Sequence, residues 1–458
     1  MTVTSIVNDS KILVDDADFR PPDRFAAPLA VKPPFVSIHT TRNDPGTEFE
    51  TLGKDLTEAM SAYVGYLRDE KLPLPSLDPS AVDSPAVKHA DGLASKDKII
   101  KLAQEICART MDPKMNLLIS SLQFHFCSCL QTALHLRVHD HIPKNGNVAA
   151  RDLATAVGAE EALLTRIMRV LTNKYIFAEP KPGYYSHTAM SWMIRGPNEY
   201  HLLAHRLDEP FRAASRQADA LAAGGYREPH SNDPFGFHLA FNTRRNFWGY
   251  LATEDLERGQ RFARAMQAVN LNTLDVIPEM YPFKKLVADG GVVVDVGGGL
   301  GQVARKIQAY YPDSGLRYIV QDGFAPMDST TDDASGVEIQ RHNFLEPQPI
   351  KGAAAYFFRH IFHDWPDSTC VHILKQTAEA MDATRSRILI CDQIMDEALP
   401  SVPSMLYDID MMTLFGGKER TLRQWDALLK AADERLYVSN IVKKMTTTII
   451  EVRVGDTK

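Results

Sequence analysis

The stretch that most constrains the fold is residues 291–301, which reads Gly-Val-Val-Val-Asp-Val-Gly-Gly-Gly-Leu-Gly. The valines around Asp295 predict a buried parallel strand, because β-branched side chains suit a pleated strand covered on both faces. The glycines that follow allow a tight turn and a close approach of the backbone to a ligand. Val303, Ile307 and Tyr310 then share one face of a predicted helix. Strand, glycine loop and helix together place a nucleotide-like ligand at the carboxyl end of an α/β sheet.

Two carboxylates distinguish between the possible ligands of this loop. Gly299, Gly301 and Ala304 also match the Gly-x-Gly-x-x-Ala variant of the dinucleotide fingerprint. However, Asp295 would face the anionic pyrophosphate of NAD, whereas it suits a ligand that carries a sulfonium and an amino group. Asp322 ends a second apolar run about twenty residues further on and can bind both hydroxyls of a ribose. These residues favour S-adenosylmethionine.

Length and charge limit the remaining possibilities. A chain of 458 residues suggests two or three domains, and 44% hydrophobic with 24% charged residues is an ordinary globular composition. A net charge of −7 argues against binding to nucleic acid or to an anionic membrane. We find no signal peptide and no apolar run near the roughly 20 residues of a membrane span. The expected partners are therefore small molecules or a second copy of the chain.

The five cysteines predict a reducing, cytoplasmic location, because they are odd in number and lie within periodic segments. Cys127 and Cys129 form a poor zinc site, since no further His or Cys follows at the spacing of a zinc finger. We expect no metal site in this chain.

Four regions are predicted along the chain. They are a loose N-terminal arm, a helical and winged-helix dimerisation domain, a helical segment that connects the domains and lines the substrate pocket, and a doubly wound, Rossmann-like α/β domain that binds the cofactor. Their bounds are 1–45, 46–196, 197–285 and 286–458. Within the last region, residues 436–443 and 445–454 are predicted to form an antiparallel hairpin at the edge of the sheet.

Amphipathic helices near the N-terminus predict a second subunit. Helices are predicted over residues 48–68 and 96–109, each with one apolar stripe that needs cover, and a long apolar helix over residues 117–136. Packing against a second copy would cover these stripes, so we predict a homodimer. Packing within the same chain is the alternative.

Residues 151–187 follow the pattern of a helix-turn-helix with a wing, in which Pro182 and Gly183 turn a hairpin. A DNA-binding regulator is the rival hypothesis for this region. Glu160 and Glu161 argue against it, because they open the helix that would read bases, where Arg, Lys or polar side chains are expected.

A second informative stretch, residues 356–367, contains the candidate catalytic base. An apolar strand ends there, and polar residues follow at the rim of the sheet where ligands bind. A histidine can take a proton from a hydroxyl near neutral pH, and a carboxylate that holds one ring nitrogen leaves the other free as acceptor. His360 and His363 are the candidate bases, and Asp392 and Glu419 are their candidate partners.

Three motifs resemble those of S-adenosylmethionine-dependent O-methyltransferases of the plant caffeic-acid and flavonoid type, and especially of their fungal secondary-metabolite branch. The motifs are Asp-Val-Gly-Gly-Gly-x-Gly, His-Asp-Trp and Gly-Gly-Lys-Glu-Arg-Thr, in the order of that family. The resemblance covers roughly residues 45–454. It implies methyl transfer to a hydroxyl of an aromatic or polyketide-type small molecule, without a metal, and a winged-helix segment that forms a dimer and closes the partner's active site.

The resemblance also implies roles for single residues. His363 is the expected base because Asp364 and Trp365 follow it, which leaves His360 a bystander, and Glu419 is one flanking acid. Asp392 stands where plant members carry a Glu, one methylene longer. The expected cofactor contacts are Asp295, Gly297, Gly299, Asp322, Asn343, Phe344 and Arg359. The expected substrate wall is Phe237, Phe241, Trp248, Met266 and either Met411 or Met412, of which we favour Met412.

Two cofactor positions depart from the family pattern. Asn343 replaces a second acid on the adenine side, and Arg359 replaces a lysine four residues before the base. An amide can still hydrogen-bond adenine or ribose, and a guanidinium can still neutralise a carboxylate. Some fungal members of the family keep the cofactor as a fixed positive charge and promote dehydration or pericyclic ring formation. The altered positions keep that alternative open, while His363 and Glu419 favour methylation.

Overall fold

The computed structural model describes residues 44–83, 87, 90–270, 274–323, 336–398, 400–444 and 447–455. All but the last two residues of the predicted N-terminal arm, 1–45, lie outside the described residues.

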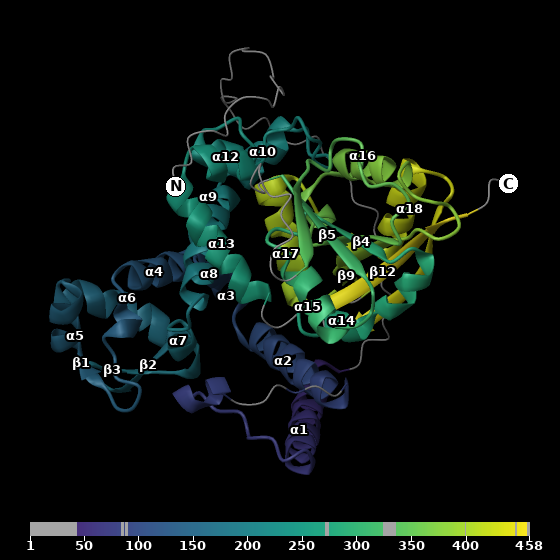
Figure 1. Ribbon diagram of the computed structural model, residues 1–458. Coiled ribbons are helices and arrows are strands. Elements are labelled where there is room, and N and C mark those ends of the chain that lie inside the picture. Colours follow the sequence, from purple (N-terminus) through teal and green to yellow (C-terminus); the bar gives the residue numbers. More distant parts are fainter. Residues whose placement is uncertain are drawn as a thin grey trace. The chain divides into compact units, whose positions relative to one another are not determined.

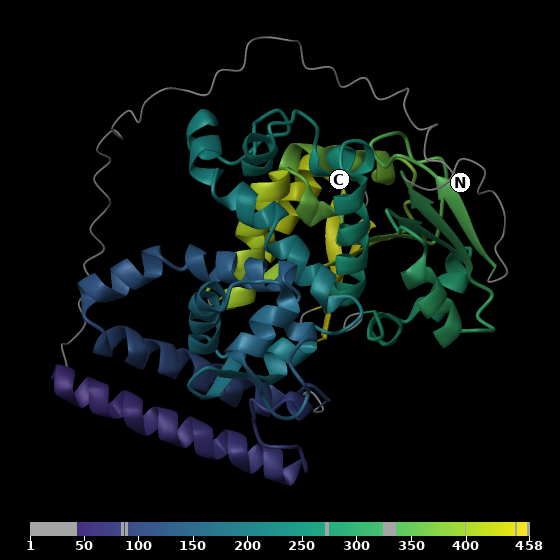
Figure 2. The same ribbon diagram turned by 90° about the vertical axis from the view of Figure 1, so that its left-hand side faces the viewer.

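The N-terminal part is helical, as the sequence predicts. Its elements are α1 (Pro45–Asp69), α2 (Ala90–Thr110), α3 (Pro113–Ser121) and α4 (Phe124–His135), with the 3-10 helices η1 (Pro79–Asp83) and η2 (Val138–Asp140). α1 lies alongside α2 (Figures 1 and 2). Leu67 and Leu102 are buried, so the apolar stripes of these two helices are covered in part within the chain.

The prediction of a single apolar helix over residues 117–136 is wrong in one respect, because two helices, α3 and α4, occupy this stretch. At the break the backbone N–H groups of Leu122 and Gln123 donate to the carbonyls three residues earlier, Ile119 and Ser120 (3.1 and 3.3 Å), and the side chain of Gln123 adds a bond to the carbonyl of Ile119 (3.2 Å). α3 buries none of its side chains, and Leu117 is 74% exposed. Taken together as Pro113–His135, this stretch is long and apolar enough to cross a membrane by length and composition alone. Within its apolar 18-residue window, 17% of the residues are buried within the chain.

Residues 148–187 form two helices and a small antiparallel sheet. The elements are α5 (Ala150–Val157), α6 (Glu161–Asn173), β1 (Val148–Ala149), β2 (Phe177–Lys181) and β3 (Tyr184–His187), with strand order β1-β3-β2. Gly183 turns the predicted hairpin with a φ of +75°, a value that suits glycine because it has no Cβ. Glu160 and Glu161 are exposed at the start of α6.

The connecting segment is a series of short helices. They are α7 (Ala189–Met193), α8 (Glu199–Arg206), α9 (Glu209–Ala214), α10 (Gln217–Ala223), α11 (Gly236–Phe241), α12 (Phe247–Thr253), α13 (Leu256–Asn270), α14 (Ile277–Met280) and the 3-10 helix η3 (Phe283–Asp289). Phe237 and Phe247 are buried in a cluster shared with the end of α17 (Val402–Phe415). The segment therefore packs its aromatic residues against the α/β domain.

The α/β domain contains a seven-stranded sheet, which confirms the predicted fold class. The strand order is β11-β12-β8-β7-β4-β5-β6. The strands are β4 (Val292–Val296), β5 (Arg317–Asp322), β6 (Val337–Arg341), β7 (Ala355–Arg359), β8 (Ile388–Asp392), β11 (Leu436–Lys444) and β12 (Thr447–Val454). β4 to β8 pair in parallel, and β11 and β12 add the predicted antiparallel hairpin at one edge.

Helices cover both faces of this sheet. α16 (Asp367–Ala378) and α18 (Leu422–Ala432) pack on one face, and α14, η3 and α15 (Gln302–Tyr310) pack on the other (Figure 1). Val303 and Ile307 of α15 are buried as predicted. The prediction for Tyr310 is wrong: it is 52% exposed, because at the last position of the helix its ring packs against Tyr311 and not on the sheet.

Candidate active site

The glycine loop after β4 is shaped by the lack of side chains. Gly297 has a φ of +72°, and a Cβ there would lie 2.5 Å from Cδ1 of Ile361. A Cβ on Gly298 would lie 2.6 Å from the carboxyl carbon of Asp295. The backbone N–H groups of Gly297 and Gly298 both donate to the carbonyl of Gln321 on β5 (2.7 and 3.2 Å). The loop is thus held at the carboxyl ends of β4 and β5, with its backbone open to a close ligand.

Two predicted cofactor carboxylates lie at these strand ends. Asp322 accepts a hydrogen bond from the N–H of Gly299 (2.9 Å). Asp295 is buried, and within the described part of the chain its Oδ2 has no hydrogen-bond partner. Burial raises the pKa of Asp295 to about 7, although Arg359 acts in the opposite direction. A buried carboxyl group with an unsatisfied oxygen fits a ligand that carries a hydrogen-bond donor or a positive charge.

The adenine side of the predicted cofactor site follows β6. Oδ1 of Asn343 accepts a hydrogen bond from Leu345 N (3.1 Å), which leaves its amide N–H₂ group as a donor. Phe344 packs edge-to-face on Trp365 (5.8 Å), and its ring lies 3.8 Å from where a Cβ of Gly297 would be. The structure therefore brings Phe344 to the glycine loop.

The predicted base follows β7 in the short 3-10 helix η4 (Phe362–Asp364). His363 Nδ1 lies 2.9 Å from Oε1 of Glu419, within hydrogen-bond distance. Its Nε2 lies 3.5 Å from Oδ1 of Asp364, which is too far for a good hydrogen bond. The His363 side chain is 19% exposed and that of Glu419 is almost fully buried, so an acceptor can reach the ring only from its open side.

Glycine also explains how Glu419 reaches the imidazole. A Cβ on Gly417 would lie 2.0 Å from the carbonyl oxygen of His363, so only glycine lets this loop pack directly on the turn that carries the base. The N–H of Glu419 donates to Oδ1 of Asp408 on α17 (2.9 Å). Asp408 was not predicted from the sequence, because nothing in its local pattern marks it.

Asp392 occupies the end of β8 but does not hold the imidazole. It is buried, and neither of its oxygens has a hydrogen-bond partner among the described residues. The predicted hydrogen bond from the histidine ring to Asp392 is therefore not formed.

The acids around His363 control its protonation. Burial alone would lower the pKa of His363, but Asp364, Glu419 and Asp392 outweigh this effect and raise the pKa to about 10. Burial raises the pKa of Asp392 to about 7 and that of Asp364 to about 6, against the opposing charge of His363. The neighbouring acids thus favour the protonated form of the imidazole.

Comparison with known proteins agrees with this geometry. Residues 226–433 match the model of the O-methyltransferase domain, and residues 119–195 match that of the O-methyltransferase dimerisation domain. A protein from Penicillium thymicola, O-methyltransferase penK, is 57% identical over 407 residues, which are 88% of this chain and 95% of that protein. The chain belongs to the O-methyltransferase family. It is an S-adenosylmethionine-dependent O-methyltransferase.

Two solved structures resemble the fold of this methyltransferase. OxaC in complex with sinefungin and meleagrin is 26% identical, with a TM-score of 0.73 over 88% of this chain and 98% of that chain. A structure described as a pericyclic reaction enzyme is 24% identical, with a TM-score of 0.65 over 79% of this chain and 94% of that chain. The second likeness concerns the fold alone.

The predicted substrate wall is brought together in part. Phe241 stacks on Phe237 (4.7 Å between ring centroids), and Trp248 stacks on Phe415 (5.6 Å), which directly precedes the Gly416–Gly417 turn. We call Phe237, Phe241, Phe247, Trp248 and Phe415 the aromatic cluster. Met266 is half-buried on α13.

The two methionines of α17 differ in place. Met411 is buried in the aromatic cluster, whereas Met412 lines a separate small cavity with Phe235 and Gly236. The structure thus places Met411, the residue we favoured less, beside the other predicted wall residues.

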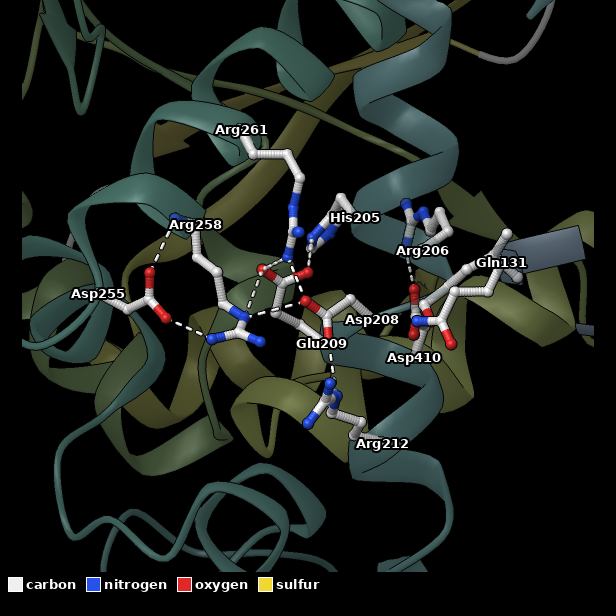
Figure 3. Close-up of polar contacts among 11 residues, drawn as sticks. Gln131, His205, Arg206, Asp208, Glu209, Arg212, Asp255, Arg258, Arg261 and Asp410 are labelled. Carbon is white, nitrogen blue, oxygen red and sulfur yellow. Dashed lines mark hydrogen bonds and ion pairs between the residues drawn. The ribbon is translucent and has the colours of Figure 1, made fainter. Parts of the chain in front are cut away.

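A network of buried charges lies beside the aromatic cluster in this methyltransferase (Figure 3). Asp208 and Glu209, at the start of α9, contact arginines from α9 and α13 and a histidine from α8. The contacts are Asp208–Arg212 (2.5 Å), Asp208–Arg261 (2.5 Å), Asp208–Arg258 (3.0 Å), Glu209–Arg261 (2.5 Å) and Glu209–His205 (3.0 Å). Arg258 also contacts Asp255, and its guanidinium lies 5.4 Å from the Phe241 ring centroid. We refer to these groups as the α9 network.

Proposed function

We propose that His363 is the general base of methyl transfer to a phenolic or enolic hydroxyl of an aromatic or polyketide-type small molecule. The observation that carries this proposal is the hydrogen bond between its Nδ1 and Glu419. Glu419 holds the proton on Nδ1 and fixes the ring, which leaves Nε2 for the proton of the acceptor hydroxyl. Phe241 and Trp248, the partly exposed members of the aromatic cluster, would supply flat apolar surface, and Trp248 stacks on Phe415 next to the loop that carries Glu419.

The raised pKa of His363 favours one class of acceptor. A protonated imidazole cannot accept a proton, so the raised pKa of His363 suits an acceptor hydroxyl that itself ionises readily. A phenol, whose pKa is about 10 in tyrosine, meets this condition better than an aliphatic alcohol, whose hydroxyl is far less acidic. Where both groups are protonated before binding, one proton passes to solvent, and the productive complex then holds a single proton between Nε2 and the acceptor oxygen.

Residues at the rim of the sheet would hold the cofactor. Asp322 suits the ribose hydroxyls, Asn343 and Phe344 the adenine, and Asp295 with Arg359 the charged amino-acid part, while the backbone at Gly297 and Gly299 leaves room for close approach. Bound S-adenosylmethionine supplies an electrophilic methyl group on a positively charged sulfur. The excess of carboxyl groups at this rim suits that charge.

The active form would be a homodimer, located in the cytoplasm. α3 exposes its apolar residues and buries none of them, and the dimerisation-domain match includes the end of this helix. A second copy is the partner that best explains such a surface, because a stable monomer rarely exposes a long apolar patch. Sedimentation at micromolar concentration tests this: a monomer that is fully active would contradict it.

The function is tested by incubating the protein with methyl-labelled cofactor and a panel of phenolic and enolic polyketides. Label in the product supports methyl transfer to oxygen. The second candidate is a cyclisation or dehydration that uses the cofactor only as a fixed charge. The missing contact between Asp392 and the imidazole favours it, because a loosened base is where the role would change first. Product formed with unreacted cofactor would support that candidate and contradict ours.

A further inference from the structure

Arg420 is a buried arginine next to Glu419 whose role the established activity does not explain. It lies in β10 (Arg420–Thr421), which pairs in parallel with β9 (Ile394–Met395). Its side chain is 0% exposed. Burying a guanidinium is costly, and an apolar side chain of similar volume would often stabilise the fold at least as well. The charge therefore needs a reason beyond packing.

The guanidinium of Arg420 donates hydrogen bonds to the turn that carries His363. Its Nη1 donates to the carbonyl of Phe362 (2.7 Å) and its Nη2 to the carbonyl of Trp365 (2.9 Å). These carbonyls stand on either side of His363 and Asp364. The turn has two backbone hydrogen bonds of its own, from Asp364 N to Ile361 O and from Trp365 N to Phe362 O (3.1 and 3.3 Å), and the thiol of Cys370 also contacts the two carbonyls (3.3 Å each). The planar guanidinium of Arg420 adds two shorter, charged donors in a fixed geometry.

The half-exposed Asp367 binds the other edge of the Arg420 guanidinium. Asp367 Oδ1 accepts from both Nε and Nη2 of Arg420 (3.0 and 2.8 Å), and its Oδ2 lies 2.9 Å from Nζ of Lys418. The side chain of Asp367 is 51% exposed. Three neighbours in sequence, Lys418 to Arg420, thus bind the His363 turn and the start of α16 from one loop.

We propose that Arg420 is a positioning residue that fixes the backbone of the His363 turn, while Glu419 fixes the imidazole. The two adjacent side chains would then act as one unit, because the hydrogen bond from Nδ1 to Glu419 requires both the ring and the turn to stay in place. The inference rests on the proposed role of His363 as the base. A displacement of about 1 Å in such a site can reduce the rate by about 100-fold.

The test compares Arg420→Lys with a matched buried arginine, Arg387→Gln. Arg387 pairs with Asp289 and contacts Tyr281 at the opposite end of β8 from the site. Lysine keeps the charge at position 420 but cannot bridge both carbonyls. We expect Arg420→Lys to lower kcat about 10- to 100-fold, with the cofactor Kd and the acceptor KM nearly unchanged. We expect Arg387→Gln to lower Tm and leave kcat within about threefold.

The pH profile and a double variant separate positioning from general destabilisation. In Arg420→Lys the apparent pKa in the kcat/KM profile should fall, because a loosened turn weakens the contact with Glu419 that keeps the imidazole protonated. In a His363→Ala background the same change should cost almost nothing further, since residues that act as a unit are not additive. A kcat within threefold of the parent protein, or an equal loss in both backgrounds, overturns the proposal.

Asp367→Asn covers the case in which Arg420→Lys does not fold, because Asp367 is half-exposed. It should give the same pattern with a smaller loss of kcat, and an unchanged kcat with an unchanged pH profile overturns the proposal. The His363→Ala protein on its own tests the base. If it keeps the rate within tenfold, the proposed function fails; if it loses the rate while the Arg420 and Asp367 variants do not, only the positioning role fails.

Discussion

The protein contains two clusters of buried charge that are built in opposite ways. In the α9 network, each carboxylate oxygen of Asp208 and Glu209 lies within 3.0 Å of an arginine or histidine nitrogen. Three carboxylates, with Asp255, face three guanidinium groups there. At the rim of the sheet, carboxyl groups outnumber the cations Arg359 and His363. Those carboxyl groups are Asp295, Asp322, Asp364, Asp392 and Glu419.

The hydrogen bonding of the oxygens differs in degree. Among the oxygens of Asp208, Glu209 and Asp255, only Oδ1 of Asp208 is buried without a hydrogen-bond partner in the described residues, and it is ion-paired with Arg212 (2.5 Å). Within the described part of the chain, Oδ2 of Asp295, both oxygens of Asp392 and Oε2 of Glu419 are buried without a hydrogen-bond partner. Unpaired buried polar groups cost stability and occur where function requires them. The α9 network, in which positive and negative charges are equal in number, thus stabilises the fold. The rim of the sheet, with its excess of carboxyl groups, suits a cationic ligand and a proton transfer.

The largest effect is expected when His363, the proposed base at the rim of the sheet, is replaced. His363→Ala should lower kcat about 10²- to 10⁴-fold, the usual contribution of a general base, and leave the cofactor Kd almost unchanged, because the proposed cofactor contacts other than Arg359 follow β4, β5 and β6. Steady-state kinetics with a phenolic acceptor and calorimetric titration of the cofactor measure the two effects. A matched change, His360→Ala, should alter kcat much less, and a loss equal to that of His363→Ala would remove the distinction between the two histidines.

The α9 network predicts the opposite outcome, a loss of stability without a loss of chemistry. Glu209→Gln leaves Arg258 and Arg261 with excess positive charge in a buried site, so we expect about 3–5 kcal/mol lower unfolding free energy. Arg212→Gln, at the exposed side of the network, should cost less than about 1 kcal/mol. Chemical denaturation gives both values. If the folded Glu209 variant had lost kcat in proportion, the network would belong to the active site after all.

More of the candidate active site than of the α9 network could be predicted from the sequence. The glycine loop, Asp322, His363 and Glu419 sit in short motifs, and their partners follow from the ends of parallel strands. Asp208 instead pairs with Arg258, 50 residues further along the chain, and neither residue carries a local signal. The break between α3 and α4 is a local switch of the backbone to i→i+3 hydrogen bonds at Leu122 and Gln123, and the apolar pattern of this stretch runs through it without a signal. The sequence shows that Asp392 is one methylene shorter than the family's Glu, but only the folded structure shows that neither of its oxygens bonds to the imidazole.

A change at Glu419 should alter how both the rate and the stability depend on pH. Glu419→Gln removes a charge that raises the pKa of His363, so the kcat/KM profile should shift to lower pH and kcat should fall about 10- to 100-fold as the ring loses its orientation. The effect on stability has a definite sign. The pKa of His363 is raised from 6.5 to about 10, so its contribution is complete below pH 6.5 and is lost as the pH rises through 10. The variant should therefore lose its stability deficit at high pH, and a deficit that persists above pH 10 would contradict this coupling.

The smallest effect on catalysis is expected at Asp392, which does not contact the imidazole. Its pKa is raised from 3.8 to about 7, so the folded state favours the protonated form, and the stability this provides is complete below pH 3.8 and lost as the pH rises through 7. Asp392→Asn keeps the shape and removes this penalty. The variant should match the parent protein near pH 4 and be more stable above pH 7, as measured by denaturant unfolding across pH. A variant that is less stable at high pH would mean that the ionised carboxylate is held by a favourable interaction, and the rim would then resemble the α9 network more closely than its unpaired oxygens indicate.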